Sequence, residues 1–434
     1  MSLLRLPRAA PALRRSYATA ANVTEAAGVK VLGIDNGLRP ATTSVSVIVK
    51  AGSRYEPAPG VAHVLKNFVF KSTASGSALK TARETELYGG VLSAGLSREY
   101  LYVNAEFLRG DEGYFLPLLA SVLSSTQFIP HEYAELVLPT VQGETEAAAA
   151  DPVQIALDTA ANVAFRRGLG NSIFASPHSP VTLDTVKAFA QAAFAKSNIA
   201  VVGQGISTEA LAAAVNSAFV GAAGSSSASL QTAKSQYHGG EARIALDTHA
   251  NPTAQPTLVI SYGQAGTTSP EVAVIPHLLG GQSALKWSPG STPLSKAAEK
   301  VAGATVRSFV TSYSDASLLN IVIQAPTNEG VRAVAQDVAA AIKAASSGVK
   351  EDDLKRAIAK AKFADATTLE HYASLVDAAA PALFTGQSVQ SQNLALDGLS
   401  TSAVSQAAKS LFAVKPTVVA VGSNVLPYAD ELGL

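Results

Sequence analysis

The residues with the clearest potential for chemistry lie in the stretch 59–73, which reads PGVAHVLKNFVFKST. A Pro/Gly break precedes this stretch, and the pattern predicts a short helix. On that helix His63 is followed by Lys66 and, one turn on, by Asn67. Two histidines at this spacing would lie on one helix face and could hold one Zn²⁺. Here the ammonium group would repel a metal cation, and an amide is a poor replacement for a second imidazole.

The same stretch resembles the inverted zinc-binding motif H-x-x-E-H of the pitrilysin-like (M16) metallopeptidases. The positions that fit the wider motif are Gly60, Ala62, His63, Leu65, Phe70, Lys71 and Thr73. The motif has its general-base Glu where this chain has Lys66, and its second His where this chain has Asn67. The family takes a third ligand, a Glu, from a later helix, and its spacing leads to Glu144 here. The resemblance therefore implies an M16 scaffold with a degenerate site, and we expect no catalytic residue and no bound metal.

No other part of the sequence predicts a local metal site. Two histidines three to five residues apart would be needed, and the seven of this chain are all more widely spaced: His63, His131, His178, His238, His249, His277 and His371. The chain also has no cysteine, which excludes disulfides, zinc knuckles and thiol chemistry. We therefore expect no cofactor on this chain.

Composition narrows the class of protein further. The 434 residues are 47% hydrophobic and 15% charged, with 33 basic and 33 acidic side chains. This balance is typical of a globular protein with more than one core, and it disfavours nucleic acid as a partner. The longest apolar run, 114–123, is about half of the roughly 20 residues that a membrane-spanning helix needs. The sequence therefore predicts no transmembrane helix.

The N-terminus has the character of a mitochondrial transit peptide. Its first 24 residues contain four arginines and neither Asp nor Glu. The segment RSYA at 15–18 resembles a matrix-processing signal, which predicts cleavage between Tyr17 and Ala18. A basic tail without a targeting role is the alternative.

The rest of the chain contains two series of elements in the same order. Predicted strands occupy 30–35, 43–51, 100–108, 199–202, 257–262, 317–324 and 417–422. Predicted helices occupy 81–90, 111–124, 130–150, 152–167, 182–195, 207–219, 270–279, 352–386 and 402–412. Three pairs of landmarks repeat at separations of 217, 218 and 219 residues: Glu112 with Glu329, Gly168 with Gly386, and Gly203 with Gly422. Such constant separations indicate a tandem duplication.

We therefore predict an α+β protein made of two homologous M16-like domains, each a mixed β-sheet covered by helices on one face. The predicted transit peptide is 1–17 and the N-terminal domain, with the degenerate zinc site, is 18–220. A Gly/Ser/Ala-rich linker spans 221–240, and the C-terminal domain is 241–434. Two tandem domains are also the architecture that the M16 resemblance implies.

A loop early in the second domain separates two groups of M16 proteins. In the alpha subunit of the mitochondrial processing peptidase, a glycine-rich substrate loop occupies this place. Here the loop 279–296 retains Gly280, Gly281 and Gly290 and is interrupted by Lys286 and Trp287. A loop with bulky side chains lacks the conformational freedom that glycine gives to the backbone. We expect a surface or subunit-contact loop, with Trp287 as an interface anchor.

This loop and the run PLSKAAE at 293–299 resemble the non-catalytic M16 members that serve as core subunits of the cytochrome bc1 complex (complex III). The resemblance implies a structural role on the matrix face of the mitochondrial inner membrane, in a homodimeric complex. The chain would pair with a core protein 1-like subunit and support cytochrome b, cytochrome c1 and the Rieske subunit. Haem and the iron–sulfur cluster would belong to those partners. The alternatives are the alpha subunit of the processing peptidase, a core 1-type subunit and an active M16 peptidase.

Overall fold

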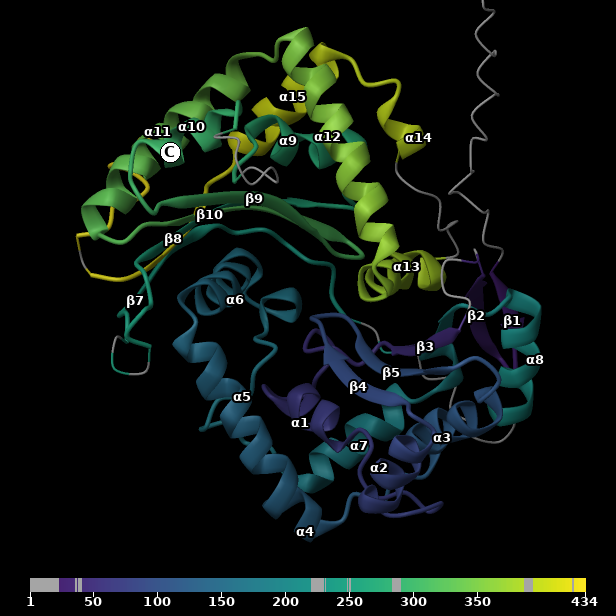
Figure 1. Cartoon of the computed structure of the whole chain (residues 1–434). Helices are drawn as coiled ribbons and strands as arrows, with labels where there is room; N and C mark the ends of the chain where they lie inside the picture. The colour runs from purple at the N-terminus through teal and green to yellow at the C-terminus, as the bar shows by residue number, and fades with distance from the viewer. Residues whose placement is uncertain are drawn as a thin grey trace, which may run out of the picture.

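The computed structural model describes residues 23–35, 37, 41–219, 230, 232–247, 249, 251–282, 290–385, 393–423 and 425–434. Within this part of the chain the protein has two halves, each built on one β-sheet with helices packed against it (Figure 1). The two halves follow one another along the chain, as the repeat predicts. The predicted cleavage site at Tyr17 and Ala18, half of the predicted linker and Trp287 lie outside the described residues.

The first sheet has six strands. Only the pairing of β2 with β6 is parallel, so the sheet is mixed as predicted. In spatial order its strands are β1 Thr24–Ala26, β2 Val29–Ile34, β6 Ile199–Gln204, β3 Thr42–Val49, β5 Leu101–Leu108 and β4 Val91–Leu96. The helices of this half are α1 Val61–Phe68, α2 Ala78–Leu87, α3 Glu112–Ser124, α4 Pro130–Glu132, η1 Tyr133–Val137, α5 Leu138–Ala150, α6 Pro152–Phe165, η2 Gly168–Gly170, α7 Leu183–Ala193, η3 Lys196–Asn198 and α8 Thr208–Phe219.

The second sheet repeats this topology with five strands. Its order is β7 Gly240–Ile244, β11 Thr417–Val421, β8 Thr257–Ala265, β10 Ala316–Gln324 and β9 Thr305–Ser312, and only β7 and β11 are parallel. Without β1, the two orders correspond strand for strand. The helices are α9 Pro270–Leu279, α10 Pro293–Glu299, α11 Asn328–Ser347, α12 Glu351–Glu370, α13 Tyr372–Thr385, α14 Asn393–Leu396 and α15 Thr401–Phe412.

The duplication extends to single hydrogen bonds on the sheets. In the first sheet the Ser46 hydroxyl donates to the Asn104 side-chain oxygen at 2.6 Å. In the second sheet Ser261 donates to Asn320 in the same way at 2.7 Å. Each pair joins the strands that correspond in the two topologies, β3 with β5 and β8 with β10. Cross-strand polar pairs of this kind help to fix the register of a sheet.

The predicted strands and long helices are present, with ends shifted by a few residues. The sequence patterns missed the four edge strands of the two sheets, β1, β4, β7 and β9. Strand β4 reads VLSAGL and combines small residues with partial exposure, so it lacks a clear alternation of polar and apolar side chains. Its position beside β5 is therefore a consequence of tertiary pairing.

The two halves exchange one helix each. Helix α6 belongs to the first half but packs on the second sheet, where Ala156 and Ala160 lie against Val259 and Val419. Figure 1 shows α6 under β8, on the sheet face opposite α9 and α11. Both faces of this sheet are therefore covered. The prediction of helices on one face was incomplete, because only the folded chain shows which sheet a helix reaches.

Helix α13 makes the reciprocal contact. It belongs to the second half and packs on the first sheet, where Val376 and Leu383 lie against Leu32 and Ile48. The Lys30 ammonium also donates to the Leu383 carbonyl oxygen at 2.6 Å. The packing boundary between the halves therefore differs from the boundary along the chain. The domain bounds 18–220 and 241–434 stay a prediction about chain segments.

We expect Leu383→Ala to destabilise the protein by about 2–5 kcal/mol, because it leaves a cavity against the first sheet. Urea unfolding would measure this change. Leu87→Ala is the control, since Leu87 is 84% exposed and its truncation should change stability by less than about 0.5 kcal/mol. Equal effects of the two substitutions would contradict the reciprocal packing of α13.

Candidate functional site

The site is built on α1, whose first turn depends on local backbone geometry. Gly60 caps the helix with a φ of 91°, a conformation that favours glycine. A Cβ at this position would also lie 2.6 Å from the Ala175 Cβ. One carboxylate oxygen of Glu56 accepts from the backbone N–H groups of Gly60 and Ala62 at 3.1 and 3.0 Å. These hydrogen bonds fix the residue at which the helix begins and orient the residues of its first turn.

The apolar side of α1 anchors it in the core of the first half. Val61, Val64, Leu65 and Phe68 are buried there with the sheet and with α3 and α7. His63 is also buried, with 3% of its surface exposed, and it points toward α5. The helix therefore presents its polar residues to the helix that carries Glu144.

Helix α5 reaches α1 through a local irregularity. The run 130–150, predicted as one helix, contains a π-helical turn at Tyr133–Val137. Pro139 lies at the start of α5 and has no N–H to donate to the preceding turn. The π-helical segment is a single wide turn between α4 and α5, the form in which π-helix is usually found. Beyond it α5 continues to Glu144, which faces α1.

The four residues of the degenerate motif form one hydrogen-bonded cluster. The His63 Nε2 atom lies 2.6 Å from one Glu144 carboxylate oxygen, and the Lys66 ammonium lies 2.5 Å from the other. The Asn67 side-chain amide donates to Glu144 at 3.0 Å and to the His63 carbonyl at 3.2 Å. The spacing argument that led to Glu144 thus identified a true neighbour of His63.

The protonation of His63 follows from its two neighbours. The Ala175 backbone N–H donates to His63 Nδ1 at 3.0 Å, so this nitrogen carries the lone pair. The proton is therefore on Nε2, which donates to Glu144. Phe174 packs edge-on against the imidazole, with ring centroids 5.6 Å apart. The sequence reasoning missed Ala175 and Phe174, because no local pattern links residues so distant along the chain.

The pKa shifts agree with a neutral histidine beside an ionised glutamate. Burial lowers the pKa of His63, although the Glu144 carboxylate opposes this effect. Burial alone would raise the pKa of Glu144, but hydrogen bonds from Asn67, Lys66 and His63 together lower it to about 2. At neutral pH the cluster therefore contains one carboxylate and one ammonium group and is electrically balanced.

This donor set does not fit the zinc ion of active M16 peptidases. A metal ligand must offer a lone pair, and in this structure His63 Nδ1 accepts a hydrogen bond from Ala175 while Nε2 donates its proton to Glu144. The ammonium of Lys66 bonds to the carboxylate that would bind the metal. Among the described residues, no group of three or more His, Asp or Glu side chains could hold a metal ion. The cluster provides neither a metal-bound water nor a general base.

Glu56 is a second residue that the sequence reasoning missed. An acidic residue just before a predicted helix start is a usable signal, because carboxylates favour helix N-termini. Burial raises the pKa of Glu56 from 4.5 to about 7, while the N–H groups of Ala62 and Gly60 act in the opposite direction. Its second carboxylate oxygen is buried and has no partner among the described residues.

Comparison with known families gives the class of protein. Residues 37–176 match the family described as insulinase (peptidase family M16), and residues 180–361 match the one described as the peptidase M16 inactive domain. A protease from Helicobacter pylori has the same fold, with a TM-score of 0.79 and 17% identity over 93% of this chain and 99% of that one. The fold and the site are those of an M16 peptidase scaffold with an altered zinc motif.

Relatives that match over their whole length define the protein more closely. The chain is 53% identical over 440 residues to cytochrome b-c1 complex subunit 2 of Cryptococcus neoformans, with 100% of each chain covered. It is 41% identical to the Neurospora crassa protein of the same name, over 99% of this chain and 96% of that one. A chain of complex III2 from Candida albicans has the same fold, with a TM-score of 0.79, 18% identity and 95% and 99% coverage. The chain belongs to the cytochrome b-c1 complex subunit 2 family of M16 proteins.

We expect the double variant Lys66→Glu/Asn67→His to bind about one Zn²⁺ per chain, because it restores the second His ligand opposite Glu144 and removes the ammonium group that repels the metal. Metal content after dialysis against zinc, measured by mass spectrometry, would test this. The control adds Glu144→Gln to the double variant and should lose the metal. A double variant with no more zinc than the unsubstituted protein would contradict the geometry.

We expect Glu56→Gln to make stability less dependent on pH. The folded-state pKa of about 7 lies above the ordinary 4.5, so the contribution of protonated Glu56 is complete below 4.5 and lost as pH rises through 7. The variant should match the native protein at about pH 5 and exceed its stability by about 1 kcal/mol at about pH 8. Urea unfolding at both pH values would measure this, with the exposed Glu86→Gln as control. Lower stability of Glu56→Gln at the higher pH would contradict the burial argument.

Proposed function

We propose that this protein is a non-catalytic structural core subunit of the mitochondrial cytochrome bc1 complex. The observation that carries the proposal is the balanced cluster of His63, Lys66, Asn67 and Glu144 in a chain that matches subunit 2 proteins over their full length. An M16 scaffold whose zinc position is occupied by this hydrogen-bonded cluster retains its two-sheet fold without a hydrolytic centre. Its contribution to ubiquinol-to-cytochrome c electron transfer is the assembly and stability of the complex.

The proposal includes a place and a set of partners. The protein lies on the matrix side of the inner membrane as a peripheral subunit, after removal of its transit peptide between Tyr17 and Ala18. No helix of the described residues is both long and apolar enough to span a bilayer. Its partners are a core protein 1-like subunit and the cytochrome b, cytochrome c1 and Rieske subunits of a homodimeric complex. Haem and the iron–sulfur cluster are carried by those partners, and this chain binds no cofactor.

A second candidate is the substrate-recognition alpha subunit of the mitochondrial processing peptidase. The chain is 29% identical over 161 residues to that subunit of Solanum tuberosum, covering 35% of this chain and 32% of that one. The match is much shorter than the match to subunit 2 proteins. Both candidates lack a complete zinc motif, so the partner proteins distinguish them.

Purification from detergent-solubilised mitochondria would test the proposal. A C-terminally tagged chain should copurify with haem b and haem c absorption bands, and N-terminal sequencing of the mature chain should begin at Ala18. Deletion of the chain should lower the amount of assembled complex. A haem-free heterodimer that contains zinc and cleaves presequence peptides would overturn the proposal in favour of the processing peptidase.

The substitution Lys66→Met provides a further test of the non-catalytic role. If the cluster has no catalytic part, this variant should support normal complex activity as long as the amount of assembled complex is unchanged. The matched control is Lys71→Met, on the same segment but outside the cluster. A loss of turnover per assembled complex in Lys66→Met alone would contradict the structural role.

A further inference from the structure

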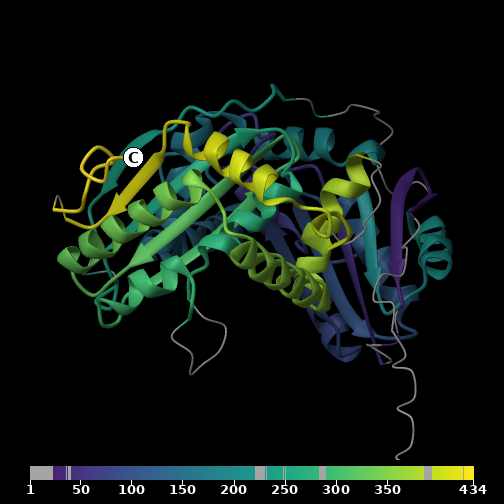
Figure 2. The ribbon, with the colours of Figure 1, turned by 90° about the horizontal axis from the view of Figure 1, so that it is seen from above.

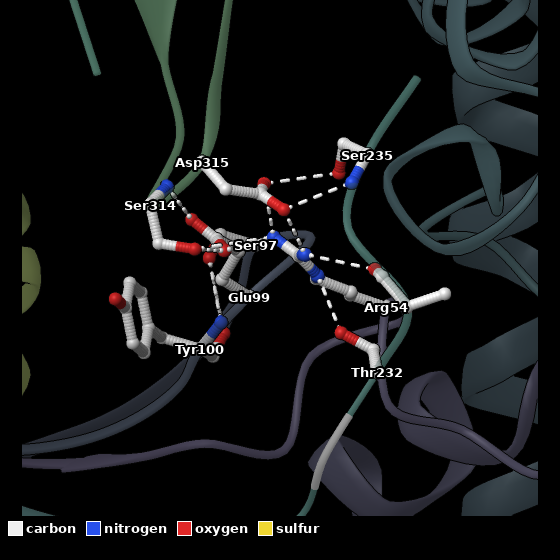
Figure 3. Close-up of polar contacts among 9 residues, drawn as sticks. Arg54, Ser97, Glu99, Tyr100, Thr232, Ser235, Ser314 and Asp315 are labelled. Carbon is white, nitrogen blue, oxygen red and sulfur yellow. Dashed lines mark hydrogen bonds and ion pairs between the residues drawn. The ribbon is translucent and has the colours of Figure 1, made fainter. Parts of the chain in front are cut away.

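The tips of two corresponding hairpins meet between the halves. One tip is the turn 97–100 between β4 and β5, and the other is the turn 313–315 between β9 and β10. An equivalent backbone hydrogen bond of 2.8 Å closes each turn. In the first turn the Ser97 N–H donates to the Tyr100 carbonyl, and in the second the Tyr313 N–H donates to the Ala316 carbonyl. The duplication therefore places Glu99 and Asp315 at matching positions, and Figure 3 shows the two carboxylates facing one guanidinium group.

That guanidinium belongs to Arg54, which follows β3 and is 7% exposed. Its Nη1 atom donates at 2.8 Å both to Glu99 and to one oxygen of Asp315. Its Nη2 atom donates to the other Asp315 oxygen at 2.6 Å, so the contact with Asp315 is bidentate. One residue of the first half thus bonds the matching acids of both halves.

The same cluster holds the part of the predicted linker that leads into the second half. Arg54 Nε donates to the Thr232 hydroxyl at 3.0 Å. The backbone N–H and the hydroxyl of Ser235 both donate to Asp315 at 2.9 Å. Across the interface, the Ser314 N–H donates to Glu99 at 2.8 Å. Three separate parts of the chain therefore meet at one cation.

The energetics of this cluster depend on the positive charge. Glu99 is buried, and Asp315 is half-buried. Burial alone would raise the pKa of Asp315, but Arg54 and Ser235 together keep it low. Without Arg54, two carboxylates would face each other with little water to screen them, which is strongly unfavourable. A guanidinium group has the planar fork that bonding to several partners needs.

The exchanged helices make contacts that are mainly apolar, with single hydrogen bonds such as those from Lys30 to the Leu383 carbonyl and from Tyr372 to the Val202 carbonyl. Helices α6 and α13 meet the opposite sheets mainly through alanine, valine and leucine. Apolar contacts are not directional, so they hold the halves together but define their angle weakly. Hydrogen bonds to a buried guanidinium are directional and define the angle closely.

We propose that Arg54 acts as a clasp that sets the angle between the two halves and fixes the segment 232–235. The exchanged helices supply cohesion, while the clasp selects one orientation. The clasp depends on the positive charge of Arg54: loss of the cation leaves two carboxylates that repel each other and drive the hairpin tips apart, and neutralising both acids removes that repulsion. This inference concerns the isolated full chain and is independent of the proposed role in the bc1 complex.

Distance measurement between the halves tests the clasp directly. Because the chain has no cysteine, Leu87→Cys and Val425→Cys give two unique, exposed spin-label sites. We expect one narrow distance distribution with Arg54 present, and a broader, shifted distribution with Arg54→Met. The variant Arg54→Met/Glu99→Gln/Asp315→Asn carries no charge in the cluster and should recover most of the narrow distribution. Unchanged distributions in both variants would overturn the proposal.

Hydrogen exchange supplies a local readout that a general loss of stability would not give. The amides of Ser235 and Ser314 should exchange at least about tenfold faster in Arg54→Met, while those of β5 and β10 stay protected. The melting temperature should fall by about 10 °C and recover in the neutral triple variant. Arg332→Met, which breaks an exposed pair with Glu431, is the matched control and should change neither readout.

Arg54→Lys keeps the proposal testable if Arg54→Met does not fold. Lysine retains the charge but cannot bond both carboxylates and Thr232 together, so we expect intermediate exchange at Ser235. Wild-type exchange at Ser235 and Ser314 in Arg54→Lys would overturn the role of the guanidinium geometry. A triple variant whose distance distribution is as broad as that of Arg54→Met would overturn the role of charge.

Discussion

The structure depends on the burial of both faces of two β-sheets. Each half of the chain covers one face of its own sheet with helices, and the other face is also partly apolar: Leu32 and Ile48 in the first sheet, Val259 and Val419 in the second. Neither half covers that second face by itself. The exchange of α6 and α13 resolves this for both sheets at once. The two halves are therefore joined through their cores, and Figure 2 shows from above the helices of the second half, in green and yellow, next to the first half, in purple to teal.

Contacts between opposite charges complete the same structure at two places. In the first half, Lys66 and Glu144 neutralise each other where an active M16 peptidase would hold its metal. Between the halves, Arg54 bonds to two acids that the duplication places opposite each other and reduces their mutual repulsion. In both places a cation of the chain offsets negative charge in a poorly hydrated position. The peptidase scaffold has thus kept its fold while its site became an ordinary polar contact.

The M16 resemblance made the site predictable to an unusual degree. The motif residues His63, Lys66 and Asn67 are neighbours in sequence, and the family spacing led to Glu144 without any structure. The contact of Ala175 with His63 was not predictable in this way, because it is made through a backbone N–H group, which carries no signature of residue type. The contact of Glu56 with the helix start was predictable only from the position of an acidic residue before the helix.

The sequence by itself determined the two series of elements, their duplication and the loss of the zinc motif, because these depend on periodicity and on residue types at fixed spacing. It could not determine which sheet α6 and α13 cover, since an alanine-rich helix fits many apolar surfaces. Nor could it show that Glu99 and Asp315 meet at Arg54, residues more than 200 positions apart at the extremes. Those contacts form only in the folded chain, which brings distant segments together in the arrangement where the apolar faces are buried and the buried charged groups are bonded at the same time.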